Sequence, residues 1–91
     1  METKEELENG IILFGAQRCN KTVYYQELLK EMELPYSFQD VEENEEAAAA
    51  LRDLYENRRL NFPTLTIGEK KLRNPSPYTL KKWLERMNWL N

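Results

Sequence analysis

Residues 11–22, IILFGAQRCNKT, constrain the fold of this 91-residue chain more than any other stretch. Four apolar residues, Ile11 to Phe14, precede Gly15 and Ala16, which predicts a buried strand that ends in a tight turn. A helical pattern begins directly after Cys19, the only cysteine. There a helix presents unpaired backbone N–H groups and about half a positive charge, and both favour a thiolate. The stretch therefore predicts a reactive thiol at a strand–turn–helix junction.

Composition restricts the class of protein. Hydrophobic residues make up 41% of the chain and charged residues 32%, which is typical of a globular domain, and we predict a single domain over residues 1–91. The longest apolar run before the glycine has four residues, whereas a membrane-spanning helix needs roughly 20. The acidic N-terminus lacks the pattern of a signal peptide. We expect a cytoplasmic protein that does not bind membranes.

Charge and residue usage exclude several functions. The net charge is −3, from 16 acidic and 13 basic residues, and the basic residues are scattered, so we expect no nucleic acid as partner. The chain has no histidine, which excludes cysteine–histidine nucleophile pairs and the common zinc sites. We expect no bound metal. The single cysteine excludes an internal disulfide.

Hydrophobic periodicity predicts seven elements in the order β-α-β-α-β-β-α. Strands are predicted over 10–15, 36–41, 64–68 and 70–73, and helices over 20–33, 45–57 and from 77 onward. Asn44 and Ser76 are the expected N-caps of the last two helices. The first β-α-β unit implies parallel pairing and the last two strands a hairpin. The predicted α/β fold has three layers, a four-stranded mixed sheet with helices on both faces, and residues 1–9 are expected to form a flexible N-terminus.

This order of elements, with a cysteine at the first helix start and a proline opening the third strand, resembles the thioredoxin fold. The glutaredoxin branch is the most similar. The resemblance covers about residues 10–88 of the chain. It rests on Ile11 to Phe14, Cys19 to Thr22, Leu28-Leu29, Pro35-Tyr36, Asp40-Val41, Phe62-Pro63-Thr64 and Ile67-Gly68.

The resemblance implies roles for several residues. Cys19 to Thr22 match the family's active motif, with Thr22 where dithiol members have a second cysteine. Pro63 matches the cis-proline that lies beside the reactive thiol in the family. Phe62 would offer its backbone N–H and C=O to an extended thiol substrate. Arg59 matches a position that contacts a carboxylate of glutathione.

Other positions depart from the family pattern. Ala16 stands where the family has a lysine, and Arg73-Asn74 stand where it has two glycines. Ser76 and Pro77 replace the acidic residues that hold the amino group of glutathione, so Ser76 offers a capping hydroxyl without negative charge. Two usual glutathione anchors are missing, which leaves glutathione itself an open question.

The position of Cys19 and the match at Pro63, taken with the resemblance, predict a thiol–disulfide oxidoreductase of the monothiol glutaredoxin type. Cys19 would form a mixed disulfide with a small thiol or a protein thiol, and an external thiol would resolve it. Arg18 and Lys21 flank the thiol and add positive charge, and Thr22 is placed to donate a hydrogen bond to it.

Simpler readings stay open at this point. Cys19 would be an inert small residue if it were buried, and Thr22 would be an ordinary helix-terminal hydroxyl. Arg18 and Arg59 would be solvated charges, and Pro63 a simple strand opener. The alternative function is a catalytically degenerate redoxin-fold binding module that uses the groove beside Pro63. A dimer bridged by a metal cluster is a third reading, but it relies on the missing glutathione anchors.

Overall fold

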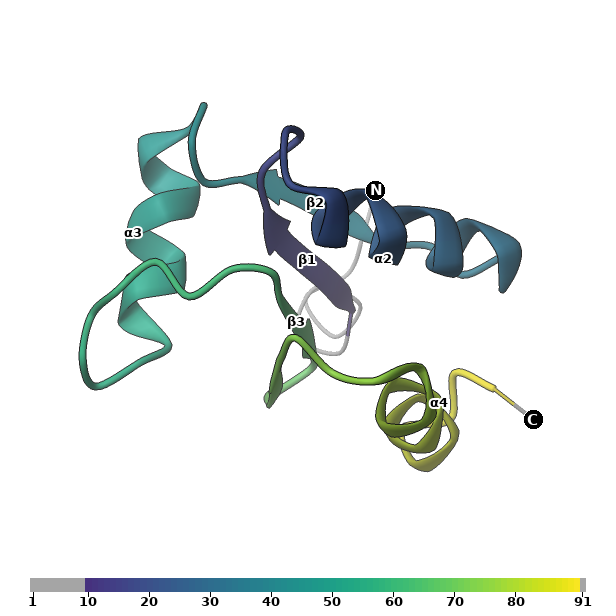
Figure 1. Ribbon diagram of the computed structural model, residues 1–91. Coiled ribbons are helices and arrows are strands. Elements are labelled where there is room, and N and C mark those ends of the chain that lie inside the picture. Colours follow the sequence, from purple (N-terminus) through teal and green to yellow (C-terminus); the bar gives the residue numbers. More distant parts are fainter. Residues whose placement is uncertain (1–9, 91) are drawn as a thin grey trace, which may run out of the picture.

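The computed structural model describes residues 10–90 (Figure 1). Over this range the elements are β1 (Ile11–Gly15), α2 (Asn20–Glu31), β2 (Ser37–Asp40), α3 (Glu45–Asp53), β3 (Thr64–Ile67), β4 (Lys70–Arg73) and α4 (Pro77–Arg86). The predicted order β-α-β-α-β-β-α is confirmed. The prediction for residues 1–9 lies outside the described residues.

The four strands form one mixed sheet in the order β2-β1-β3-β4. β1 pairs parallel with β2, where Leu13 lies opposite Phe38, and antiparallel with β3, where Leu13 lies opposite Leu65. β3 and β4 form the predicted antiparallel hairpin, with Leu65 opposite Leu72. β1 is thus an inner strand, and the turn that follows it emerges from the middle of the sheet.

Helices cover both faces of the sheet, which makes the three predicted layers (Figure 1). Because successive side chains of a strand point to opposite faces, Leu13 and Phe14 enter different cores. Leu13 is buried with α2 and α4, among residues that include Leu29 and Leu80. Phe14 is buried against α3, whose contribution includes Leu51 and two alanines. Ala47 and Ala48 therefore pack on the sheet, while Ala49 and Ala50 are exposed.

Two helices end earlier than their sequence patterns predict. α2 stops at Glu31 instead of residue 33, because Glu33 has a φ of 57° and the Leu34 N–H turns back to the carbonyl of Leu29. α3 stops at Asp53 instead of residue 57. Its last turn tightens, since the Tyr55 N–H donates to the carbonyl three residues before it.

Contacts with the sheet explain the early end of α3. The Tyr55 hydroxyl lies 2.8 Å from Thr64 Oγ1 on β3, and the Lys71 ammonium lies 4.3 Å from the centre of the Tyr55 ring. Lys71 Nζ also donates to the carbonyl of Leu54 at 2.7 Å. These contacts hold the chain in a turn where helix propensity alone would continue the helix.

Gly15 ends β1 at a point where the strand meets the first turn of α2. A Cβ at this position would lie 2.6 Å from Thr22 Cγ2 and 3.0 Å from Thr22 Cβ, and it would also meet Thr22 Oγ1. Thr22 cannot move aside easily, because it is fully buried and accepts a 3.2 Å hydrogen bond from the Ala16 N–H. The absence of a side chain at Gly15 is what lets α2 begin this close to the sheet.

We predict that Gly15→Ala lowers the free energy of unfolding by about 1–3 kcal/mol, the usual cost of overpacking a filled core. Urea denaturation monitored by circular dichroism measures it. The penalty should shrink in a Thr22→Ala background, where two of the three crowding atoms are gone. Fully additive penalties in that double mutant would contradict the steric explanation.

Candidate active site

Cys19 is the N-cap residue of α2, at the strand–helix junction that the sequence predicts. Its own N–H donates to the carbonyl of Ala16 at 2.9 Å, and its carbonyl accepts from the N–H of Val23 at 3.1 Å. The side chain makes no capping hydrogen bond, and the residue is partly exposed. The backbone of Cys19 is therefore fixed while its thiol is left available to a reactant.

The surroundings of the thiol lower its pKa. Burial raises the pKa of Cys19, but interaction of the thiolate form with the Thr22 hydroxyl and with the backbone N–H groups of Thr22 and Lys21 lowers it. The positive charge of Lys21 lowers the pKa further. The first turn of α2 contains no acidic residue that would oppose these effects. The net result is a pKa below the ordinary value of a thiol.

Thr22 lies between the turn and the thiol. A hydroxyl can donate one hydrogen bond and accept two. That of Thr22 accepts from the buried N–H of Ala16 and, through its effect on the thiolate form, lowers the pKa of Cys19. The same side chain therefore satisfies the backbone and stabilises a thiolate.

Arg18 is directed mainly toward Glu42. Arg18 Nε lies 2.7 Å and 2.9 Å from the two carboxylate oxygens of Glu42, and Nη2 lies 2.6 Å from one of them. This hydrogen bonding and the charge of Glu42 raise the pKa of Arg18, and the influence of Cys19 on that pKa is the smallest. Arg18 thus ties the Cys19 turn to the loop between β2 and α3. Of the two predicted cations, Lys21 is the one that acts on the thiol.

Phe62 and Pro63 lie at the same end of the sheet as Cys19. The peptide bond between them is cis. Thr64, the next residue, pairs with Phe14 near the end of β1, so the two segments leave the sheet side by side. Pro63 is buried, and its carbonyl accepts from the N–H of Asn74 at 3.0 Å. Phe62 is half-buried and packs on the α3 side.

The remaining two predicted site residues differ in position. Ser76 is the N-cap of α4, where its hydroxyl accepts from the N–H of Thr79 at 3.1 Å, and it lines a groove next to α2. Arg59 is exposed in the loop before Pro63, where its N–H donates to Asn57 Oδ1 at 3.0 Å. Arg59 is not among the residues that line the groove.

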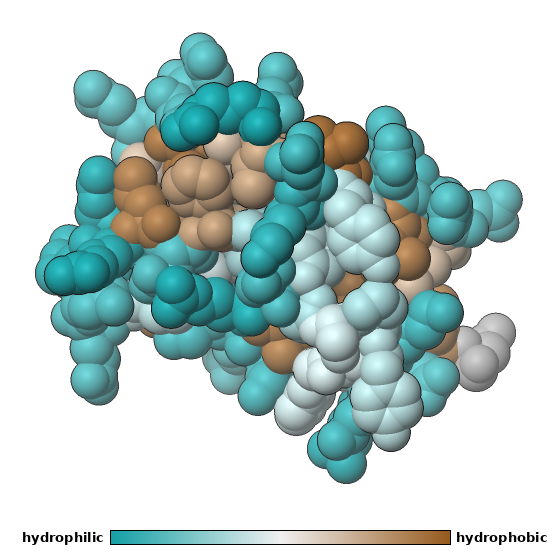
Figure 2. Space-filling model, viewed as in Figure 1, coloured by the Kyte–Doolittle hydropathy of each residue, from teal (hydrophilic) through white to brown (hydrophobic). Residues whose placement is uncertain are grey.

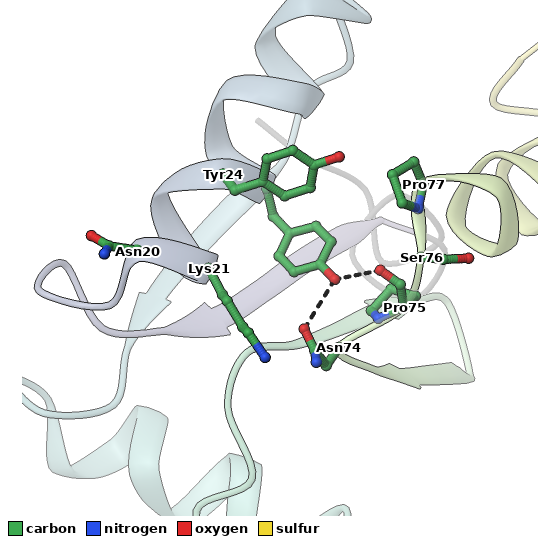
Figure 3. A pocket seen from close by; sticks show the side chains of 8 residues that line it. Asn20, Lys21, Tyr24, Asn74, Pro75, Ser76 and Pro77 are labelled. Carbon is green, nitrogen blue, oxygen red and sulfur yellow. Dashed lines mark hydrogen bonds between the residues drawn. The ribbon is translucent and has the colours of Figure 1, made fainter.

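This groove has a volume of about 470 Å³ and lies between α2 and the start of α4 (Figure 3). Lys21 and Tyr24 reach it from α2, and the Tyr25 hydroxyl closes one wall by donating to Asn74 Oδ1 at 3.2 Å and to the carbonyl of Pro75. Its lining consists of Asn20, Lys21, Tyr24, Tyr25, Asn74, Pro75, Ser76 and Pro77. The sequence alone did not predict this groove. The three-residue spacing of Lys21 and Tyr24, which puts both on one helix face, was the available signal.

Solved structures with a similar fold are known. The thioredoxin-like protein BC3987 shares 26% sequence identity with a TM-score of 0.63, covering 79% of this chain and 96% of that chain. The fold of this chain is thioredoxin-like. A glutaredoxin from Archaeoglobus fulgidus shares 15% identity with a TM-score of 0.69, covering 90% of this chain and 94% of that one.

A buckwheat glutaredoxin solved in complex with glutathione is also similar to this thioredoxin-like chain. It shares 16% identity with a TM-score of 0.67, covering 94% of this chain and 93% of its own. No protein-family model matches the chain, and neither does any curated protein. The similarity is therefore one of fold.

Two further properties concern the described residues of this thioredoxin-like domain. Between residues 10 and 90, no three side chains of His, Cys, Asp or Glu gather in a way that would hold a metal ion. Across the same range, every helix is too short or too polar to cross a membrane.

We predict that Cys19 reacts with iodoacetamide with a pH midpoint below the value of about 8.5 of an ordinary cysteine. Because the lowered pKa comes from the thiolate form being stabilised, half of the thiol ionises at a lower pH. Thr22→Val and Lys21→Gln should each raise the midpoint. Arg18→Gln should shift it less, since Glu42 holds that guanidinium.

Val23→Ala is the matched control, because Val23 is exposed on the same helix and is not among the groups that lower the thiol pKa. Its midpoint should equal that of the wild type. A wild-type midpoint at or above about 8.5 would contradict the hydrogen-bonded thiolate.

Proposed function

We propose that this protein is a thiol–disulfide oxidoreductase of the monothiol glutaredoxin type, acting in the cytoplasm, with Cys19 as its only nucleophile. The observation that carries the proposal is the position of this thiol at the start of α2, where Thr22 and Lys21 lower its pKa. The thioredoxin-like fold and its similarity to solved glutaredoxins support the same reaction class.

The proposed reaction consists of two displacements. The Cys19 thiolate attacks one sulfur of a disulfide, a new S–S bond forms, the old S–S bond breaks, and the displaced sulfur leaves as a thiolate. An external thiolate then attacks the substrate sulfur of the mixed disulfide, and Cys19 leaves as a thiolate. Because the chain has one cysteine, no internal thiol can carry out the second step.

The lowered pKa serves the second displacement more than the first. An ordinary thiol with a pKa near 8.5 is only about 3% ionised at pH 7. A lower pKa raises the thiolate fraction, but intrinsic nucleophilicity falls with a Brønsted slope of about 0.4–0.5 and offsets most of the gain. A thiol of low pKa is, however, a better leaving group. Release of the bound substrate is therefore the step that Thr22 and Lys21 favour.

Phe62 and Pro63 are proposed to hold the substrate. No hydrogen bond within residues 10–90 uses the backbone N–H or carbonyl of Phe62, so both groups are available to an extended substrate chain. The bond from the Asn74 N–H to the Pro63 carbonyl holds this segment against the end of β4. We assign Phe62 a binding role through its backbone and Pro63 a positioning role.

Glutathione is the small thiol that the related solved structure suggests, since the buckwheat glutaredoxin binds it. In this chain Lys21 and the Ser76 end of α4 would meet its carboxylates, and Arg59 would contribute from the loop before Pro63. No carboxylate lines the groove, however, to pair with the ammonium group of glutathione. Glutathione therefore fits as an external reductant better than as a tightly bound ligand.

We predict that the purified protein, supplied with dithiothreitol, accelerates reduction of a small aromatic disulfide, and that Cys19→Ser abolishes the acceleration. Without an external thiol, the wild type should stop at one mixed disulfide per chain, because nothing internal resolves it. Mass spectrometry of the intact protein detects the adduct. Val23→Ala should match the wild type.

The binding-module alternative makes the opposite prediction. If wild type and Cys19→Ser reduce the disulfide at the same background rate, and no adduct forms at Cys19, the oxidoreductase proposal is wrong. The groove would then have a binding role only.

A further inference from the structure

The groove beside Cys19 has an aromatic and apolar lining. Tyr24 is 45% exposed, and its ring meets that of Tyr25 edge to face, with 5.3 Å between the ring centres. Pro75 and Pro77 form the opposite side (Figure 3). Aromatic rings and proline rings together offer flat surfaces on which a further aromatic side chain can stack.

Two hydroxyls of the groove are already bonded within the protein. The single proton of the Tyr25 hydroxyl faces both Asn74 Oδ1 and the carbonyl of Pro75, and the Ser76 hydroxyl is bonded to Thr79 through both its oxygen and its proton. Figure 2 shows a pale surface of residues with intermediate hydropathy between α2 and α4. A ligand in this groove gains mainly from contact area.

Charge complementarity restricts the ligand further. Lys21 is the single charged residue among the eight that line the groove, and none of the eight is acidic. The groove also lies at the N-terminal ends of α2 and α4, whose dipoles favour negative charge. A carboxylate is therefore favoured near Lys21, while an ammonium group would be desolvated without a partner.

We infer that the groove binds a polypeptide segment next to the reacting cysteine, with an aromatic side chain between Tyr24 and Pro77 and an acidic side chain at Lys21. This inference rests on the exchange reaction proposed for Cys19. The γ-glutamyl residue that precedes the cysteine of glutathione carries an ammonium group, whereas a residue that precedes a cysteine inside a polypeptide carries only an amide. A volume of about 470 Å³ accommodates an aromatic side chain and its neighbour.

The test uses acetylated and amidated peptides whose cysteine is linked to 2-nitro-5-thiobenzoate. The Cys19 thiolate attacks the peptide sulfur, the S–S bond to thiobenzoate breaks, and the coloured thiobenzoate leaves as a thiolate. In one peptide the cysteine is flanked on each side by Phe and Glu. In the other peptide Ser replaces each Phe and Lys replaces each Glu. Each rate is divided by the rate with the small aromatic disulfide, which removes differences in thiol reactivity.

We expect the Phe–Glu peptide to react about tenfold faster than the Ser–Lys peptide, as an aromatic contact and an ion pair at a half-buried site would give. Tyr24→Ala should lose the preference for Phe, and Tyr24→Phe should keep it because the ring remains. Lys21→Glu should reverse the preference for the acidic side chain. Val23→Ala, beside Tyr24 but outside the groove, should keep the whole preference.

Equal normalised rates for the two peptides would overturn the inference while leaving the exchange reaction intact. A glutathione–thiobenzoate disulfide that reacts faster than the Phe–Glu peptide would also overturn it, because the groove would then accept the ammonium group of the γ-glutamyl residue. Failure of Cys19 to react even with the small aromatic disulfide would overturn the proposed function as well.

Discussion

Both the fold and the site depend on the interactions of the Thr22 hydroxyl. It accepts a 3.2 Å hydrogen bond from the buried N–H of Ala16, in the turn that leaves the sheet. A buried N–H without a partner would lower the stability of the fold. The hydroxyl also stabilises the thiolate form of Cys19 and so lowers the pKa of that thiol. Gly15 permits this arrangement by leaving room for the Thr22 side chain. Stability of the turn and reactivity of the thiol are therefore linked through one side chain.

The positive charges around the thiol are divided between two directions. Glu42 holds Arg18 on the side of the β2–α3 loop, in an exposed pair that contributes little to stability. Lys21 lies on the other side, where it both acts on Cys19 and lines the groove. The region around Cys19 is thus electrostatically asymmetric. A substrate that carries a carboxylate on the groove side fits this asymmetry.

Local signals in the sequence predict most of the fold, and contacts between distant residues account for what they miss. The order of elements, the caps and the position of Cys19 follow from apolar periodicity and a few capping residues. The early end of α3 does not, because it depends on the contact of Tyr55 with Thr64. The pairing of Arg18 with Glu42 spans 24 residues, and the groove forms only where α2 meets the start of α4. No local pattern encodes those contacts.

The most direct measurement is the rate at which the Cys19 mixed disulfide is broken by dithiothreitol. Because a stabilised thiolate is a good leaving group, the folded protein should release its substrate thiol several-fold faster than a synthetic peptide of residues 16–22 carrying the same adduct. The difference should disappear in urea, where the hydrogen bonds of Thr22 and the N-terminus of α2 are lost. Equal rates for the folded protein and the peptide would contradict the account of Cys19 as an activated thiol.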